Sequence, residues 1–291
     1  MAALDIHHDP TPTTMPPPDN GRTLRERLEE LIDSGYLDLP ILPAVAAEVV
    51  ALTSDEDCDI RKLAEIVRRD QAMAGHMLRM ANSATHRAVV QVASLTQAMS
   101  RLGMQLVRQF AFVISCQNRV FRVQGREEQL KQLFRHSLAT ALYAQEIARA
   151  RRSNVEEAFL AGLLHDVGRP VLLQAVTDFT TTMPFSEADV EESVNALHAY
   201  VGGELARQWG LSDRLGEAIA HHHNPAAAPA NREGALTVRL ADDLAHRLEP
   251  NPPDMDVHMH PALAPLNLYP EDVDRLLGLA EKISAQVEEL G

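Results

Sequence analysis

An adjacent histidine and aspartate, His165 and Asp166, end an apolar stretch that begins at Ala158. A neutral imidazole beside a carboxylate suits a zinc, manganese or iron ion, and the apolar neighbours would hold both side chains against a packed wall. More residues of the same two types follow or precede the pair at long spacing: His136, His198, the run His221-His222-His223, and the pair Asp242-Asp243. This combination predicts a metal site.

Helical periodicity places these residues on different elements. We expect helices over about 130–150, 155–166, 191–209, 213–222 and 234–248, with a shorter element near Val171. A helical bundle binds metal through side chains that project inward from facing helices, and two ions bridged by a carboxylate would need about this many ligands. The predicted ligands of one or two divalent transition-metal ions (Fe, Mn or Zn) are His136, His165, Asp166, His198, His222 and Asp242. Such a site suits phosphoester hydrolysis, because a metal activates water and stabilises a phosphoryl oxygen.

Each of these residues also has an ordinary structural explanation. His136 and His198 could be half-buried helix histidines, and the run His221-His222-His223 could end a helix and face its negative dipole. Asp242 and Asp243 could be surface charges beside nearby arginines. The prediction therefore depends on the whole set and its order along the chain, and not on any one member.

The remainder of the chain is also helical in pattern. Apolar residues recur at three- and four-residue steps from Leu24, and Gly35 closes that first segment. Ser94 is placed to cap a helix that Gly103 would end. Strand alternation is scarce, so we expect an all-α protein.

A polar segment around Gly125 is the best boundary between two helical lobes. Residues 1–22 are rich in Pro, Thr and Asp without a hydrophobic period, so we expect a disordered tail there. Residues 23–125 are then expected to form an N-terminal lobe and residues 126–291 a second helical bundle. A helix expected over 271–290 could cover the core of that lobe or form the interface of a homodimer.

Composition indicates a protein of the cytoplasm. Cys58 and Cys116 are the only cysteines among 291 residues, which excludes a disulfide framework. No apolar run approaches the roughly 20 residues that a membrane span needs, and the N-terminus lacks the pattern of a secretory signal.

Charge is distributed unevenly along the chain. The net charge is −14, yet residues 61–135 contain thirteen Lys and Arg against four acids. This basic region could contact nucleic acid, an acidic partner or the acidic remainder of the chain. Because no aromatic residues interleave with its arginines, single-strand binding is disfavoured.

The order His, His-Asp and then Asp resembles the HD superfamily of metal-dependent phosphohydrolases. More motifs, spread over about 24–248, resemble HDOD proteins, which carry the HD-related output domain of bacterial signalling. These motifs are Leu39-Pro-Ile-Leu-Pro43, Leu63-Ala-Glu-Ile66, Leu78-Arg-Met-Ala-Asn-Ser-Ala84, Ser94-Leu-Thr-Gln-Ala98 with Leu102-Gly103, His136-Ser137, and Ala158-Phe-Leu-Ala-Gly-Leu-Leu-His-Asp-Val-Gly168.

The resemblance implies a regulatory domain whose second lobe is an HD-like helical bundle. Many HDOD members are thought to have lost the catalytic ligands, whereas this chain keeps residues that match the superfamily positions: His136, His165, Asp166 and Asp242. His198 and His222 resemble the extra ligands of the related HD-GYP cyclic-di-GMP phosphodiesterases.

Two departures separate the chain from those phosphodiesterases. Arg169 stands where they have Lys after His-Asp-x-Gly, and Asn224-Pro225 with alanines replaces their Glu and Gly-Tyr-Pro loop. Arg169 could contact a phosphate, or it could pair with a nearby carboxylate.

Three functions remain open. A signalling adaptor would bind a protein partner or a nucleotide second messenger without turnover, and any metal would then be structural. A metal-dependent phosphohydrolase would act on a nucleotide or cyclic nucleotide. A regulator associated with nucleic acid would use the basic region over 61–135.

Overall fold

Helices form the regular secondary structure of the computed structural model over the residues that it describes, which are 22–53, 60–69, 71–82, 92, 94–120, 123–180 and 185–290. The prediction of an all-α protein is confirmed. Residues 1–21 of the expected tail, Cys58, and parts of the basic region lie outside the described residues. The α-helices are α1 (Leu24–Asp33), α2 (Ala44–Thr53), α3 (Ile60–Arg68), α4 (Gln71–Ala81), α5 (Leu95–Leu102), α6 (Met104–Arg119), α7 (Glu127–Arg151), α8 (Val155–Leu164), α9 (Gly168–Thr180), α10 (Glu187–Gln208), α11 (Asp213–Ala220), α12 (Arg232–His246), α13 (Pro270–Leu277) and α14 (Ala280–Leu290), and the short 3₁₀ turns are η2 (Pro225–Ala227) and η3 (Val257–Met259).

Polar caps and glycines set the ends of several helices. The Thr23 hydroxyl accepts a hydrogen bond from the Glu26 backbone N–H, and the Glu26 carboxylate accepts one from the Thr23 N–H, which caps α1. The Ser94 side chain accepts from the Gln97 N–H at the start of α5. Gly103 ends α5 with a φ of +82°, a conformation that favours glycine. Ser94 and Gly103 thus have the roles predicted for them.

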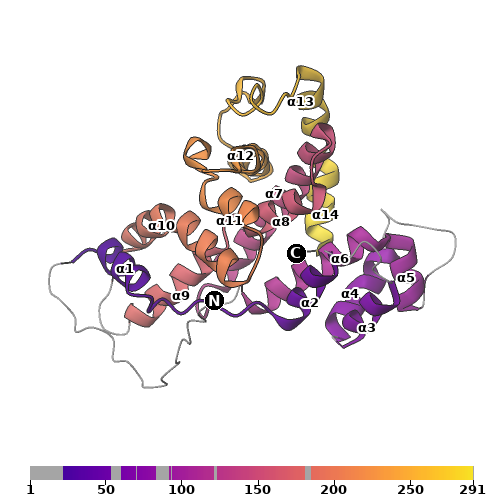
Figure 1. Ribbon diagram of the computed structural model, residues 1–291, viewed down its shortest axis with the longest axis horizontal. Coiled ribbons are helices and arrows are strands. Elements are labelled where there is room, and N and C mark those ends of the chain that lie inside the picture. Colours follow the sequence, from indigo (N-terminus) through magenta and orange to yellow (C-terminus); the bar gives the residue numbers. More distant parts are fainter. Residues whose placement is uncertain are drawn as a thin grey trace, which may run out of the picture.

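Two groups of helices make up the described chain (Figure 1). Helices α2 to α6 pack on one another, and helices α7 to α12 form the larger group, which α13 and α14 join through α7. The chain passes from one group to the other at Gly125, which has a φ of +81°. The division into two domains near residue 125 stays a prediction, and the two groups of helices are called the first and second lobe below.

Helix α1 departs from that division, because it packs on α10 in the second lobe (Figure 1). Its buried face carries three leucines at helical spacing: Leu24, Leu28 and Leu31. The indole Nε1–H of Trp209, after α10, donates to the Pro40 carbonyl at 2.7 Å and holds the segment between α1 and α2 on the same lobe. The sequence prediction grouped residues 23–33 with the first lobe, because periodicity reveals an apolar face but not the surface that it meets.

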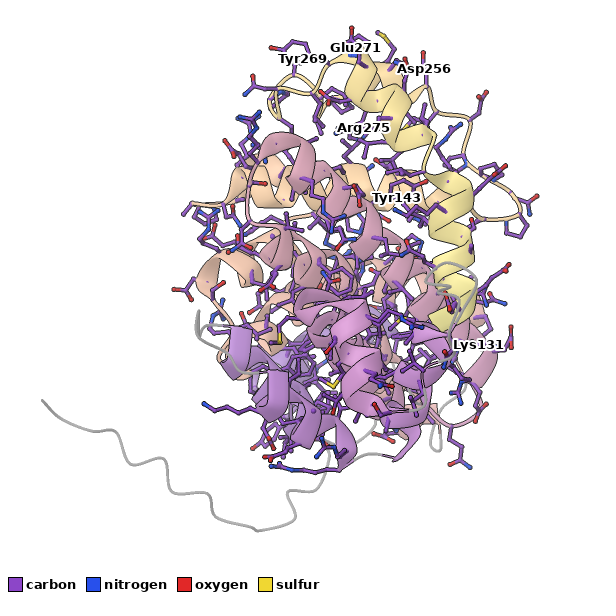
Figure 2. All side chains as sticks on the ribbon, turned by 90° about the vertical axis from the view of Figure 1, so that its right-hand side faces the viewer. Lys131, Tyr143, Asp256, Tyr269, Glu271 and Arg275 are labelled. Carbon is purple, nitrogen blue, oxygen red and sulfur yellow. The ribbon has the colours of Figure 1, made fainter. Side chains whose placement is uncertain are left out.

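The single helix expected over 271–290 is two helices in the structure. Helix α13 ends at Gly278, whose backbone N–H bonds to the Asp274 carbonyl, and α14 begins at Ala280. The break lets α13 contact η3 while α14 lies along α7. In Figure 2, Tyr269, Glu271 and Arg275 mark the end of the molecule that α13 forms, and Lys131 near the start of α7 lies toward the opposite lobe.

None of the described helices is both long enough and apolar enough to span a membrane.

Candidate metal centre

Two glycines without room for a side chain seat the end of α8 between α7 and α10. A Cβ atom on Gly162 would lie 2.8 Å from the Ala141 Cα, and one on Gly168 would lie 2.1 Å from the His198 carbonyl oxygen. Because glycine lacks a Cβ, these backbones approach closely. His165, which caps α8, and Asp166 in the following turn are therefore held against α7 and α10.

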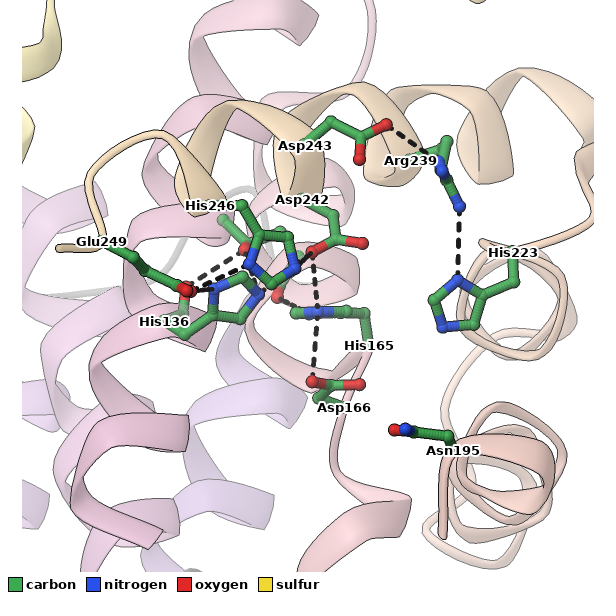
Figure 3. A network of polar contacts seen from close by, with 12 residues as sticks. His136, His165, Asp166, Asn195, His223, Arg239, Asp242, Asp243, His246 and Glu249 are labelled. Atoms are coloured by element: carbon green, nitrogen blue, oxygen red, sulfur yellow. Dashed lines mark hydrogen bonds and ion pairs between the residues drawn. The ribbon is translucent and has the colours of Figure 1, made fainter. Parts of the chain in front are cut away.

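All six side chains predicted as ligands converge in the second lobe, from α7, the turn after α8, α10, the turn after α11, and α12: His136, His165, Asp166, His198, His222 and Asp242. Nε2 of His136 lies 3.0 Å from Oδ1 of Asp242, and Nε2 of His198 lies 3.1 Å from Oδ1 of Asp166. Nε2 of His165 lies 3.7 Å from Asp166 and 3.8 Å from Asp242. The ring of His222 is 5.1 Å from the ring of His165. Figure 3 shows several of these groups facing a common interior.

Three buried imidazoles of this set are fixed in the same tautomer. Nδ1 of His165 bonds to the Gly162 carbonyl at 2.7 Å, Nδ1 of His198 to the Val194 carbonyl at 3.0 Å, and Nδ1 of His222 to the Ile219 carbonyl at 2.7 Å. A carbonyl only accepts, so each Nδ1 carries the proton, and each Nε2 of a neutral ring offers a lone pair. Metal-ligating histidines usually have this outer hydrogen bond.

Nε2 of His222 is buried and has no hydrogen-bond partner among the described residues. Burial lowers the pKa of His222 well below its ordinary value and also lowers the pKa of His165, so both rings are neutral. A buried polar atom without a partner needs an explanation. A cation bound by this lone pair would provide one.

The two carboxylates of the set are ionised although they are buried. Burial raises the pKa of Asp166, but the neighbouring His165, the contact with His198 and the charge of Arg169 together outweigh burial, and the pKa lies well below its ordinary value. At Asp242, burial acts in the same direction and is outweighed by the hydrogen bond from His136, so this pKa is also well below the ordinary value. Two carboxylates and several imidazole lone pairs at one point form a donor set for a divalent transition metal.

Comparison with known proteins shows the family. Residues 39–225 match the HDOD domain family. The chain belongs to the HDOD family.

Curated relatives of this HDOD protein match over part of their length. An uncharacterized protein of Treponema pallidum (strain Nichols) is 24% identical over 238 residues, which is 78% of this chain and 46% of the relative. Ribonuclease Y of Geobacter metallireducens is 31% identical over 124 residues, which is 43% of this chain and 20% of the enzyme. The matched regions thus span less than half the length of these two relatives.

Solved structures share the fold of this HDOD protein. A candidate metal-dependent phosphohydrolase from Shewanella amazonensis SB2B aligns with a TM-score of 0.71 and 19% identity over 91% of this chain and 98% of its own. An HDOD domain protein of unknown function from Geobacter sulfurreducens aligns with a TM-score of 0.70 and 24% identity over 92% and 98% of the two chains. At these identities, the likeness shows the fold alone.

Two residues of this HDOD protein that the sequence analysis missed surround His136. Nδ1 of His136 lies 3.1 Å from Oε1 of Glu249, and His246 lies 2.9 Å from the same oxygen and 3.2 Å from Asp242. Burial disfavours the charged imidazole, yet the hydrogen bonds to Asp242 and Glu249 raise the pKa of His136 to about 10. The available signal was spacing, since His246 follows Asp242 by four positions on α12 and Glu249 follows His246 by three, just after the helix ends.

Arg169 pairs with a carboxylate, which is one of the two roles that the sequence analysis left open for it. Its Nε lies 2.8 Å from Oδ2 of Asp166, and its Nη1 donates to Oδ1 of Asn195 at 2.7 Å. Arg169 also lines the cavity described below, so its guanidinium lies beside the site and not out in solvent.

A cavity of about 910 Å³ opens onto the donor set. Its walls come from α7, α9, α10, α12 and α14, and they include Arg135, Arg169, Asn195, His223, Glu249 and Glu288. The volume is that of pockets that hold small molecules and cofactors. Three of the candidate ligands, His136, Asp166 and Asp242, therefore line a space large enough for an organic ligand.

Several overlapping triads have ligand atoms within 4.8 Å of one another. Two of them use only predicted ligands and share His165: His136 with His165 and Asp166, and His165 with His222 and Asp242. A third consists of His198, His222 and His223, and a fourth of His136, His246 and Glu249. The donor atoms thus fit a metal ion, and their number accommodates one ion or two.

Proposed function

We propose that this HDOD protein is a metal-dependent phosphohydrolase whose centre is built from the six predicted ligands: His136, His165, Asp166, His198, His222 and Asp242. The observation that carries the proposal is the partnerless Nε2 of His222, buried next to ionised carboxylates and to the Nε2 lone pairs of other neutral imidazoles. Without a cation, these groups bring negative charge and lone pairs together at a cost. With one, the lone pair of His222 Nε2 has a partner.

The protein residues around the ion would have distinct tasks. A bound divalent metal supplies a nucleophilic water near neutral pH and neutralises charge on a phosphoryl oxygen. Asp166 and Asp242 balance the charge of the metal, and the Nδ1 hydrogen bonds of His165, His198 and His222 keep each Nε2 directed inward. Glu249 has the same role for His136, because it accepts from Nδ1 while Nε2 faces Asp242.

The cavity supports a phosphorylated organic molecule of nucleotide size as substrate. Its volume of about 910 Å³ exceeds what inorganic phosphate needs, and Arg135 and Arg169 supply positive charge on walls that also carry Glu191 and Glu288. The 31% identity with a segment of ribonuclease Y supports a phosphodiester as the reacting group. A nucleotide or cyclic nucleotide combines these features.

Elemental analysis combined with turnover tests this proposal. Wild type, His165→Ala and Asp166→Ala are purified, their metal content is measured, and hydrolysis of bis(p-nitrophenyl) phosphate is assayed after loading with Mn, Fe or Zn. We expect stoichiometric metal and turnover in wild type and the loss of both in the two variants. His258→Ala is the matched control, because this exposed histidine pairs with Asp274 away from the site. A wild type that binds no transition metal would contradict the proposal.

A second function, a signalling domain that binds its ligand without turnover, is favoured by one specific observation. The guanidinium of Arg169, the residue nearest to the metal ligands that could grip a phosphate, is paired with Asp166 at 2.8 Å and with Asn195. In that case the metal is structural, and the domain would pass its signal to a protein partner. Metal that is stoichiometric and lost in His165→Ala, together with nucleotide binding and no product, would support this function over hydrolysis.

A further inference from the structure

A series of hydrogen bonds runs from the segment before α13 toward the cavity. Its first donor is a backbone N–H, which can only donate. The backbone N–H of Ala262 donates to Nδ1 of His260 at 3.1 Å. Because a neutral imidazole carries one proton, the proton of His260 is on Nε2, from which it is donated to Oδ2 of Asp243 at 2.9 Å. His260 is buried, so this end of the series is anchored in packed structure.

Arg239 continues this series of hydrogen bonds from Asp243. Its Nε donates to the same Oδ2 of Asp243 at 2.9 Å, and its Nη1 lies 3.3 Å from Nδ1 of His223. Figure 3 draws both contacts as dashed lines. A guanidinium has only donors, so Nδ1 of His223 must accept. The proton of His223 is therefore on Nε2. Asp243, which the sequence allowed as a surface charge, instead orients Arg239.

His223 then donates toward the candidate metal centre. Its Nε2 lies 3.0 Å from Nε2 of His198, and the proton of His198 is engaged with the Val194 carbonyl through Nδ1. Because the proton of His223 is on Nε2, the bond runs from His223 to His198, whose Nε2 also lies 3.1 Å from Oδ1 of Asp166. Each bond from Ala262 to Val194 thus has one consistent donor and one acceptor.

This polarity gives His223 a different role from its neighbour His222. A metal ligand needs a free lone pair, but on His223 the proton occupies Nε2 and Arg239 occupies the lone pair of Nδ1. The proximity of His223 to His198 and His222 would otherwise suggest a third ligand. The hydrogen bonds argue for a donor instead.

We infer that His223 is a hydrogen-bond donor to an anion held at the metal centre, and that Arg239, Asp243 and His260 are its positioning residues. When Nε2 of His198 binds an ion, the N–H of His223 loses its acceptor and faces the cavity that it lines. A donor left in that position is satisfied by a phosphoryl oxygen. The anion-binding part rests on the proposed function, whereas the tautomer of His223 does not.

The tautomer is tested on metal-free protein by long-range ¹H–¹⁵N correlation of the histidine rings, with His223→Gln used to assign the signal. We expect Nδ1 of His223 to be unprotonated and Nε2 to carry the proton. Arg239→Gln is expected to mix the two tautomers, and Arg239→Lys, which keeps a cationic donor, to restore part of the wild-type pattern. Arg232→Gln is the control, because Arg232 is an exposed residue on the same helix. A wild-type His223 protonated on Nδ1 overturns the inference.

Metal content and affinity for inorganic phosphate test the role of the donor. In metal-loaded protein, His223→Ala is expected to keep its metal and to bind phosphate about tenfold to hundredfold more weakly, as expected for the loss of a hydrogen bond to a charged group. His223→Gln, which retains an N–H donor, is expected to recover part of the affinity, while His222→Ala loses the metal.

Loss of metal from His223→Ala as complete as from His222→Ala would overturn the inference, and so would unchanged phosphate affinity. If wild type binds no metal, both the proposed function and the anion-binding role of His223 are contradicted. The positioning of His223 by Arg239 is then still decided by the ring spectra of the metal-free protein.

Discussion

Nε2 of His136 lies 3.0 Å from Oδ1 of Asp242, although 106 positions separate the two residues in the chain. The contact joins α7 to α12, which packs against it. Glu249 accepts from the other nitrogen of the same ring at 3.1 Å. His136 thus lies between two carboxylates, and its charge state links the stability of the lobe to the state of the metal site.

The first prediction concerns the pH dependence of stability without metal. Burial disfavours the His136 imidazolium, but the hydrogen bonds to Asp242 and Glu249 raise its pKa from 6.5 to about 10. Because the folded-state pKa is the higher one, the contribution of this charge is complete below about pH 6.5 and is lost as the pH rises toward 10. We expect the free energy of unfolding of chelator-treated protein to fall across that interval in denaturant titrations.

Asp242→Asn is the matched variant for this prediction. It removes the charge of the hydrogen-bond acceptor and keeps its shape, so the decline between pH 6.5 and 10 should be smaller than in wild type. An equally steep decline in the variant would show that another group is responsible.

The second prediction is that metal binding releases protons. His136 must lose the proton on Nε2 to coordinate an ion, because its pKa of about 10 keeps the ring charged at neutral pH. We expect the metal affinity to rise with pH, and calorimetry in two buffers of different ionisation enthalpy to report about one proton released per ion that His136 binds. His136→Gln should remove this release. A binding heat that does not depend on the buffer would contradict the prediction.

The convergence of the six candidate ligands could be predicted because His and Asp are unusual in an apolar helix and their order resembles that of a known superfamily; that they bind a metal stays a prediction. It could not show His246 and Glu249, since charged residues near a helix end are usually solvated. Their role depends on His136 arriving from a helix 110 positions earlier.

The role of His223 could not be predicted from the sequence, for a related reason. A tautomer is set by hydrogen-bond partners, and here the partners are Arg239 on α12 and His198 on α10. Hydrophobic periodicity also could not predict the placement of α1 or the break at Gly278, because it identifies apolar faces and not the surfaces that they contact.

The third prediction uses the partnerless nitrogen of His222. Replacement by Leu removes a buried acceptor that lacks a hydrogen bond, at the loss of one bond to the Ile219 carbonyl. We expect the metal-free variant to be no less stable than wild type, and up to about 1 kcal/mol more stable. Added metal should stabilise wild type and leave His222→Leu unchanged, which thermal unfolding with and without metal can measure.

His198→Leu is the control for this comparison. Both ring nitrogens of His198 have partners, so its loss leaves the N–H of His223 without an acceptor. We expect this variant to lose about 1–3 kcal/mol of stability in the absence of metal. If His222→Leu is destabilised as much as His198→Leu, the nitrogen of His222 has a partner in solution.

The last prediction concerns the close approach that positions the His-Asp pair. A Cβ on Gly168 would lie 2.1 Å from the His198 carbonyl oxygen, a distance at which backbone must move. Gly168→Ala should therefore separate α9 from α10, draw Asp166 away from its 3.1 Å contact with His198, and cost about 1–3 kcal/mol of stability. Because the donor set is opened, the loss of metal affinity should be larger than this destabilisation alone explains.

Gly75→Ala separates this effect from a general change in helix propensity. Gly75 lies in α4, and a Cβ there would have its nearest neighbour at 3.6 Å, which is ordinary contact. Alanine is favoured over glycine within a helix by up to about 1 kcal/mol, so this variant should be at least as stable as wild type and keep its metal. If Gly168→Ala binds metal as tightly as Gly75→Ala, the contact between α9 and α10 does not position the His-Asp pair.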